Sequence, residues 1–153
     1  MKVKELLQDL QEKENYKKFK EENPEAFFCS AMFILGDADK IDLNFFLPNQ
    51  DKLSSFAMPF ASITNHQEEI YDQKEIKNLN LKVDICELKN HIKEKTGKDY
   101  PKIIAVLHNG IWNLTCLNGM DMNRMNLDAH TGEIQKKEEG SLNDMIQIRK
   151  TSE

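Results

Sequence analysis

The sequence contains almost no arginine and no long apolar run, and these shortages argue against two classes of protein. Only Arg124 and Arg149 among its 21 basic residues are arginine, and the formal net charge is -5. Affinity for a phosphate backbone depends on clustered Lys and Arg, and no dense basic block occurs here, so we do not expect nucleic-acid binding. A membrane span needs roughly 18 consecutive apolar residues, which no stretch approaches, so we expect no membrane insertion.

Cysteine is also sparse. Cys29, Cys86 and Cys116 are an odd number at wide spacing, which does not indicate a disulfide framework. Residues 1–23 lack the uninterrupted apolar core of a secretion signal. We therefore expect a cytosolic, cytoplasmic protein. With 39% apolar residues over 153 positions, the chain can form a globular core, either as one domain or as two small halves.

The residue types that carry chemistry form no recognisable motif. Cys86 and His91 are five positions apart on an expected helix, which separates them by about 140° around the axis. No CxxC or HxxxH spacing occurs. The acidic stretch 37–42 lacks the glycine and the glutamate of a calcium-binding EF-hand loop. We predict no enzyme, no catalytic residues, no cofactor and no metal, although a Cys–His nucleophile assembled across strands stays open.

The first 60 residues read as a helical region followed by a three-stranded meander. Apolar residues recur at helical spacing over 3–22, and a bend is expected near Asn15, where the apolar face changes. Period-two alternation predicts the strands, and Pro59 indicates an edge position or a strand end. The expected strands are 26–35, which is apolar enough to be central, 41–47 and 53–60.

The next helix has well-marked ends. Residues 61–82 are polar and irregular and are expected to form a connection. Asp84 can cap the helix, Glu87 completes a capping box, and Gly97 stands where a left-handed C-terminal residue is favoured.

A second meander follows, with strands expected at 102–107, 111–117 and from 120 onward. Asn118 and Gly119 predict a type I′ turn, because both central residues of that turn need positive φ. After Met122 the apolar alternation shifts phase, so a β-bulge is expected near Asn123 or Arg124.

Both halves thus predict a helix followed by three strands. The fold class is α+β, with antiparallel β-meanders packed against helices. The expected segments are 1–60, the connection 61–82, the second unit 83–134 and a tail at 135–153. Two arrangements stay open, namely a tandem of two α-β-β-β units and one continuous domain with a single curved sheet and its helices on one face.

A short motif follows the last expected strand. Asp128 is followed by two spacer residues, by Thr131 and Gly132, and then by an acidic and an aliphatic residue. Asp128 can accept hydrogen bonds from the turn's amides, and Gly132 permits positive φ. Together with the order of helix and meander over 85–134, this motif resembles that of the PepSY-like domains.

The resemblance implies units of PepSY-like or cystatin-like type and a non-catalytic role. PepSY-like domains occur in propeptides of secreted proteases, where they inhibit, and in envelope proteins thought to regulate peptidases. This chain shows neither a secretion signal nor an attached protease domain. The resemblance therefore supports the fold and a binding role better than it supports protease inhibition.

We expect a non-catalytic, regulatory module that binds a protein or a peptide. An exposed sheet edge would accept an extended segment, or a second copy of the chain in a homo-oligomer. The alternative is a small-molecule-binding or enzymatic domain with a pocket between helix and sheet.

Overall fold

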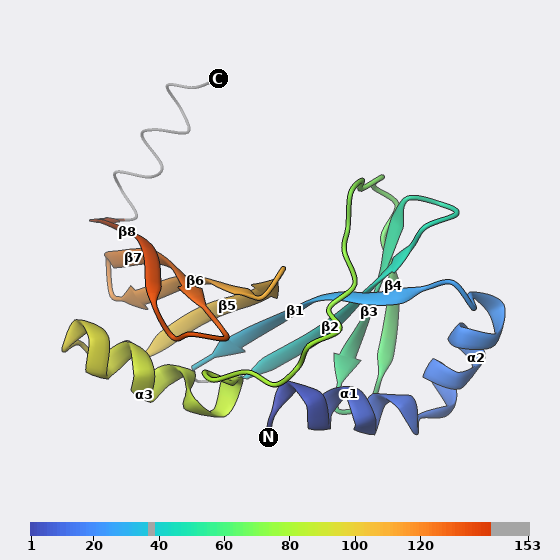
Figure 1. Ribbon diagram of the computed structural model, residues 1–153, viewed down its shortest axis with the longest axis horizontal. Coiled ribbons are helices and arrows are strands. Elements are labelled where there is room, and N and C mark those ends of the chain that lie inside the picture. The colour runs from blue at the N-terminus through green and yellow to red at the C-terminus, as the bar shows by residue number, and fades with distance from the viewer. Residues whose placement is uncertain (37–38, 142–153) are drawn as a thin grey trace.

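The computed structural model describes residues 1–36 and 39–141. Three helices and eight strands follow one another along this part of the chain (Figure 1). Their bounds are α1 Val3–Gln11, α2 Glu14–Glu22, β1 Phe27–Leu35, β2 Lys40–Leu47, β3 Lys52–Met58, β4 Ser62–Asn65, α3 Ile85–Thr96, β5 Lys102–His108, β6 Ile111–Asn118, β7 Asp121–Asp128 and β8 Ile134–Ser141.

The eight strands form one antiparallel sheet in the order β4-β3-β2-β1-β5-β6-β7-β8. Each half of the chain contributes a four-stranded meander, and the two meanders meet through their first strands. In the central ladder Ala31 pairs with Leu107 and Phe33 pairs with Ala105. The α+β class with antiparallel meanders is therefore confirmed, and the described strands form a single sheet.

Two of the strands lie in segments for which the sequence predicted no strand. β4 begins inside the expected connection 61–82, and β8 occupies the start of the expected tail 135–153, whose residues 142–153 lie outside the described part. All four residues of β4 are exposed. An edge strand is held by backbone pairing on one side and need not bury side chains, so apolar alternation does not mark it.

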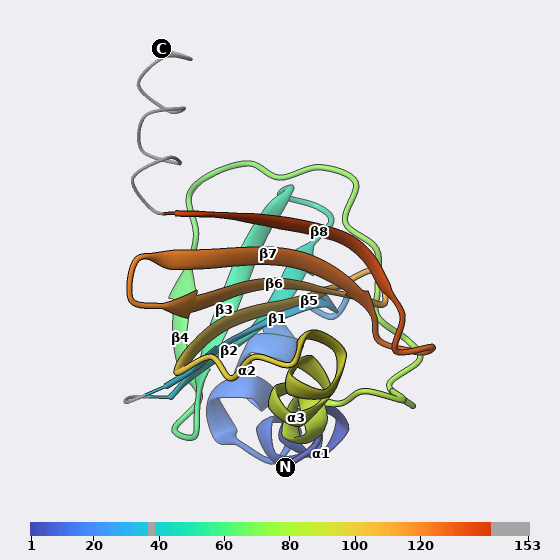
Figure 2. The ribbon, with the colours of Figure 1, turned by 90° about the vertical axis from the view of Figure 1, so that its left-hand side faces the viewer.

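All three helices cover one face of the sheet, α1 and α2 under the first half and α3 under the second (Figures 1 and 2). Burial of apolar side chains between these layers is the main stabilising term, at about 25 cal/mol per Å². The buried helical residues are Val3, Leu6 and Leu10 of α1, Phe19 of α2, and Ile85, Leu88 and Ile92 of α3.

Aromatic side chains pack in the core of the first half and at the joint between the two halves. In the first half Phe19 packs edge-on against Phe45 and Phe56, with ring centroids 6.0 and 5.2 Å away. Across the central strands, Phe33 lies 5.8 Å from Trp112. Trp112 is fully buried, and its indole N–H donates to the Val83 carbonyl at 2.8 Å, which holds the start of α3 against the sheet.

Two local predictions in the second meander are wrong. The β6–β7 loop consists of Gly119 and Met120, since Asn118 pairs with Asp121, and of these two only Gly119 has positive φ. This pattern fits a type II′ turn rather than the expected type I′ turn on Asn118 and Gly119. No bulge interrupts the β6–β7 ladder near Asn123, because β7 buries side chains on both of its faces there.

The start of α3 also differs from the expected capping box. The Asp84 carboxylate accepts from Ile85 N–H at 2.8 Å and, across the core, from Val3 N–H at 2.9 Å. Among the described residues, the Glu87 carboxylate makes no return hydrogen bond to complete the box. Asp84 thus joins the first turns of α1 and α3, while Glu87 stays exposed. Gly97 ends α3 in the left-handed conformation, with φ 72°.

Replacing Asp84 by Ala leaves two buried N–H groups without acceptors, so we expect the free energy of unfolding to fall by about 2 kcal/mol. Glu87→Ala is the matched control, and its expected effect is below about 0.5 kcal/mol. Urea unfolding followed by Trp112 fluorescence measures both values. Equal losses for the two variants would indicate a capping box after all.

Candidate functional site

The sheet face turned away from the helices, which we call the open face, is apolar along its centre. On this face β1 presents Met32 and Ile34, and β5 presents Ile104 and Val106, all of them half-buried. The outer strands present polar or charged side chains to the same face, among them Asn44, Arg124 and Lys136. The connection between β4 and α3 first runs on the side of the sheet that faces away from the helices, and it then descends to the helical side (Figure 2).

The first half of the open face contains a cavity of about 520 Å³, which we call the Ser55 pocket. Its floor consists of side chains of β1, β2 and β3, and the start of the connection forms a wall. The wall is fixed to the sheet by backbone bonds from His66 N–H to Leu53 and from Ile70 N–H to Asp51. The lining residues are Met32, Asp42, Asn44, Leu53 and Ser55, with connection residues 66–68 and 70.

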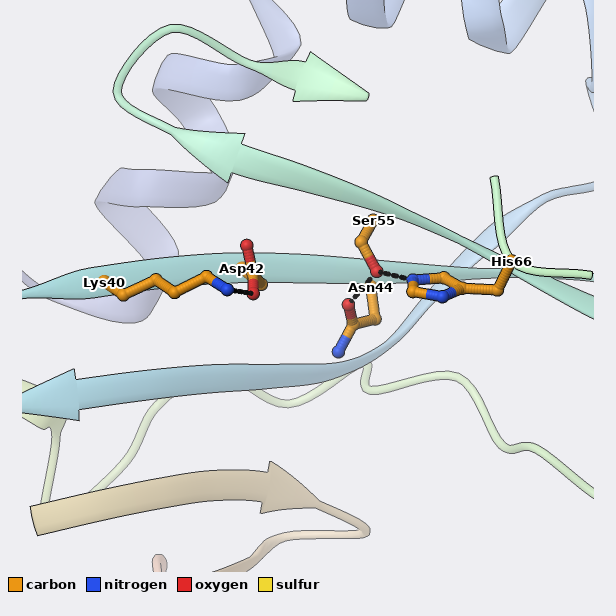
Figure 3. Close-up of polar contacts among 5 residues, drawn as sticks. All are labelled: Lys40, Asp42, Asn44, Ser55 and His66. Atoms are coloured by element: carbon orange, nitrogen blue, oxygen red, sulfur yellow. Dashed lines mark hydrogen bonds and ion pairs between the residues drawn. The ribbon is translucent and has the colours of Figure 1, made fainter. Parts of the chain in front are cut away.

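A chain of hydrogen bonds runs through this pocket (Figure 3). Asn44 Nδ2 donates to Ser30 Oγ at 2.9 Å, which turns Asn44 Oδ1 toward Ser55. Ser55 Oγ donates to Asn44 Oδ1 at 2.6 Å. His66 Nε2 lies 2.8 Å from Ser55 Oγ, and because the hydroxyl proton is already committed to Asn44, His66 Nε2 is the donor of that bond.

This direction of hydrogen bonding argues against a serine nucleophile. A histidine that activates serine must accept the hydroxyl proton, whereas His66 donates to Ser55. In the described ranges 1–36 and 39–141, no carboxylate orients the other ring nitrogen of His66. Beneath the pocket, burial raises the pKa of the Cys29 thiol to about 11, so the thiolate is scarce near neutral pH.

The second half of the open face contains a smaller cavity of about 310 Å³, which we call the Arg124 depression. Ile104 and Val106 form its apolar side toward the sheet centre. Its outer side is charged, and Lys136 Nζ lies 3.1 Å from Glu138 Oε1. The remaining lining residues are Asn113, Leu114, Thr115, Arg124, Met125 and Asn126.

The residues singled out from the sequence lie away from the Ser55 pocket. Asp128 accepts from the N–H groups of His130 and Thr131 at 2.8 and 3.1 Å, and Gly132 has φ 81°. His91 of α3 contacts the Gly132 carbonyl through Nε2 at 2.8 Å, so this turn docks the helix. Asp84, Glu87 and Gly97 mark the ends of α3, while Asn118 and Gly119 lie at the β6–β7 turn.

Sequence reasoning missed Asn44, Ser55 and His66. Asn44 and Ser55 occupy the polar positions of alternating strands, a pattern that normally indicates a solvated face. The available signal was the short turn after Leu47, which sets the hairpin register and places Asn44 opposite Ser55. His66 pairs with Ser55 only because the chain folds back as β4, which the sequence did not predict.

In the described part of the chain, no three His, Cys, Asp or Glu side chains gather as metal ligands. Across the same residues, no helix has the length and apolarity to cross a membrane. The fold and the open face together define a small α+β protein with a two-meander antiparallel sheet whose helices cover one side.

Comparison with known proteins adds to the fold only. No protein-family model matches the chain, and no curated protein does so, which leaves the PepSY-like resemblance an expectation. The crystal structure of a "putative lipoprotein" from Clostridium difficile 630 is similar, with a TM-score of 0.53 and 7% identity, over 82% of this chain and 90% of that one. At that identity the similarity shows a shared fold.

The three thiols should differ sharply in reactivity. Cys86 is exposed, whereas Cys29 and Cys116 are buried and burial raises the pKa of each to about 11. We expect a disulfide reagent at pH 8 to modify Cys86 rapidly and the other two only after denaturation, since the thiolate is the reactive form. Cys86→Ser should remove the fast phase, and a fast phase that survives this substitution would contradict the burial of Cys29 or Cys116.

Proposed function

We propose that the chain is a non-catalytic module that binds a protein or peptide partner on the open face of its sheet. The observation that carries this proposal is the apolar centre of that face. Met32, Ile34, Ile104 and Val106 are half-buried on the two central strands without a helix over them in the described residues.

An antiparallel sheet that faces water usually presents polar side chains on its solvated side. Here the central strands are largely apolar on both faces, and polar or charged side chains such as Asn44, Asn113 and Arg124 lie beside them on other strands. Protein interfaces combine an apolar core with a polar rim in this way. The PepSY-like resemblance, which implies a binding and regulatory role, agrees with this proposal.

A second route is proposed for self-association or for an added peptide strand, at the β4 edge. In an antiparallel ladder, hydrogen-bonded and non-hydrogen-bonded residue pairs alternate along the strands. The bond from His66 N–H to the Leu53 carbonyl makes this pair a hydrogen-bonded one and so sets which β4 residues bond to β3. It follows that the N–H and C=O groups of Ile63 and Asn65 point away from β3. β4 has no charged residue, and both Phe60 and Ile63 beside this edge are exposed.

The opposite edge suits strand addition less well. Lys136, Lys137 and Glu138 follow one another along β8, and charged side chains on an edge deter pairing with further strands. We therefore assign any added strand to β4. We also propose a cytosolic location, because three free cysteines without a disulfide suit a reducing compartment.

Val106→Lys tests binding on the open face, because it puts a charge into the centre of the proposed interface. We expect at least about a tenfold loss of affinity for a partner that co-purifies with the tagged wild-type chain. Asn90→Lys, which adds the same charge at an exposed position of α3, is the matched control and should bind normally. Quantitative co-purification, followed by titration of the purified partner, measures the effect. The absence of any partner, or equal binding by both variants, would refute the proposal.

Self-association is tested separately by light scattering at rising protein concentration. Ile63→Lys should shift the protein toward monomer, since the lysine charges the β4 edge. Gln135→Lys at the β8 edge should leave the dimer population unchanged. A concentration-independent monomer in the wild type would remove this second route.

A further inference from the structure

We infer that the Ser55 pocket is a subsite for a cation on an aliphatic stem, the side chain of Arg or Lys in a partner. The inference rests on the proposed function, since it names the chemistry that the partner presents to the first half of the open face. Three properties of the pocket support it: its hydrogen-bond acceptors, its apolar lining and its negative charge.

The hydrogen-bond chain engages the Ser55 hydroxyl proton, one N–H of Asn44 and Nε2–H of His66, which leaves the second Asn44 N–H and the Gln67 amide as the remaining side-chain donors of the described lining. The Ser55 hydroxyl donates to Asn44, the Asn44 amide donates to Ser30, and His66 Nε2 donates to Ser55. Ser55 is only 8% exposed, so this network is fixed rather than rearranged by water. In the described residues no donor reaches Nδ1 of His66, which in the neutral ring is an acceptor.

Two carboxylates add to these acceptors. Asp42 lies beside Asn44 on the floor with its side chain 15% exposed, and Glu68 lies on the wall formed by the connection. The described partner of Asp42 is Lys40, whose Nζ is 3.6 Å from Oδ2, longer than a good hydrogen bond. A cation that donates a hydrogen bond at shorter range stabilises a buried or half-buried carboxylate more strongly.

The remaining lining suits an aliphatic stem. Met32 and Leu53 on the sheet and Ile70 on the connection supply apolar contact beside the carboxylates. Arg and Lys commonly bury their methylene stems on apolar surface while the charged end meets a polar partner. The volume of about 520 Å³ lies within the usual range of ligand sites.

The negative charge of the chain also favours a cationic side chain in the pocket. The whole chain carries a formal net charge of -5, which favours approach of a cationic partner. Lys40 shows that an ammonium group can sit at the rim of the pocket near Asp42, and its side chain is 57% exposed, so it can move aside (Figure 3). Lys40 is then a competitor of the incoming cation, and its removal should strengthen binding.

The test is a titration of the ¹⁵N-labelled full chain with butylguanidine, butylamine and pentanoate, followed through backbone amide shifts. Butylguanidine and butylamine, which carry one positive charge each, should produce saturable shifts centred on Asn44, Ser55 and His66, and pentanoate should not. Tighter binding of butylguanidine identifies an Arg side chain as the occupant, and tighter binding of butylamine identifies Lys. Saturable binding of pentanoate at the same residues, or no saturation by either cation, would overturn the inference.

Three variants sharpen the result. Asp42→Asn should weaken cation binding about tenfold, as expected for loss of a hydrogen bond to a charged group. Lys40→Ala should strengthen it about two- to threefold, since an ion pair with a half-exposed lysine is a weak competitor. Asp121→Asn, which removes the same charge at the distant β6–β7 turn, is the control and should change nothing. Equal effects of Asp42→Asn and Asp121→Asn would mean only general charge attraction and would overturn the site.

The outcome can be separated from that of the proposed function. If the small cations fail to bind while a partner still depends on Val106, the pocket inference alone is wrong. If they bind in the Ser55 pocket but no partner is captured, the proposed function fails and the pocket stands as a cation site.

Discussion

The pairing of β1 with β5 is the interaction on which the rest of the structure depends. Each is the first strand of its meander, and their ladder, from Ser30 opposite His108 to Leu35 opposite Ile103, turns two four-stranded units into one sheet. Both units then present their helices to the same face, where Phe33 meets Trp112 across the joint. The other face is apolar at this same joint, and it is the face on which we propose that a partner binds.

The sequence predicted those elements whose formation is governed by local chemistry. Apolar runs and period-two alternation predicted six of the eight strands, because β1, β2, β3, β5, β6 and β7 each bury side chains on the helical side. Asp84 and Gly97 marked α3 through cap chemistry that needs only a few neighbouring residues. The edge strands β4 and β8 were not predicted, since backbone pairing holds them and their sequences show no alternation of apolar residues.

The candidate site was not predictable in the same way. Asn44, Ser55 and His66 are ordinary polar residues in the sequence, and they meet only because the connection folds back along the sheet after β4. The interior is the opposite case. Among the described side chains, every buried nitrogen and oxygen has a hydrogen-bond partner, so the core offers no orphaned group for chemistry. On the open face, by contrast, acceptors and apolar groups stay accessible.

Hydroxyl-radical footprinting of the chain, free and with a captured partner, tests most directly whether the open face is the binding surface. Met32 lies at the centre of that face, and Met120 lies exposed at the β6–β7 turn as an internal reference. The account predicts that a partner lowers the oxidation of Met32 and leaves that of Met120 unchanged. Unchanged oxidation of Met32 in the complex, with protection on the exposed sides of the helices instead, would contradict it.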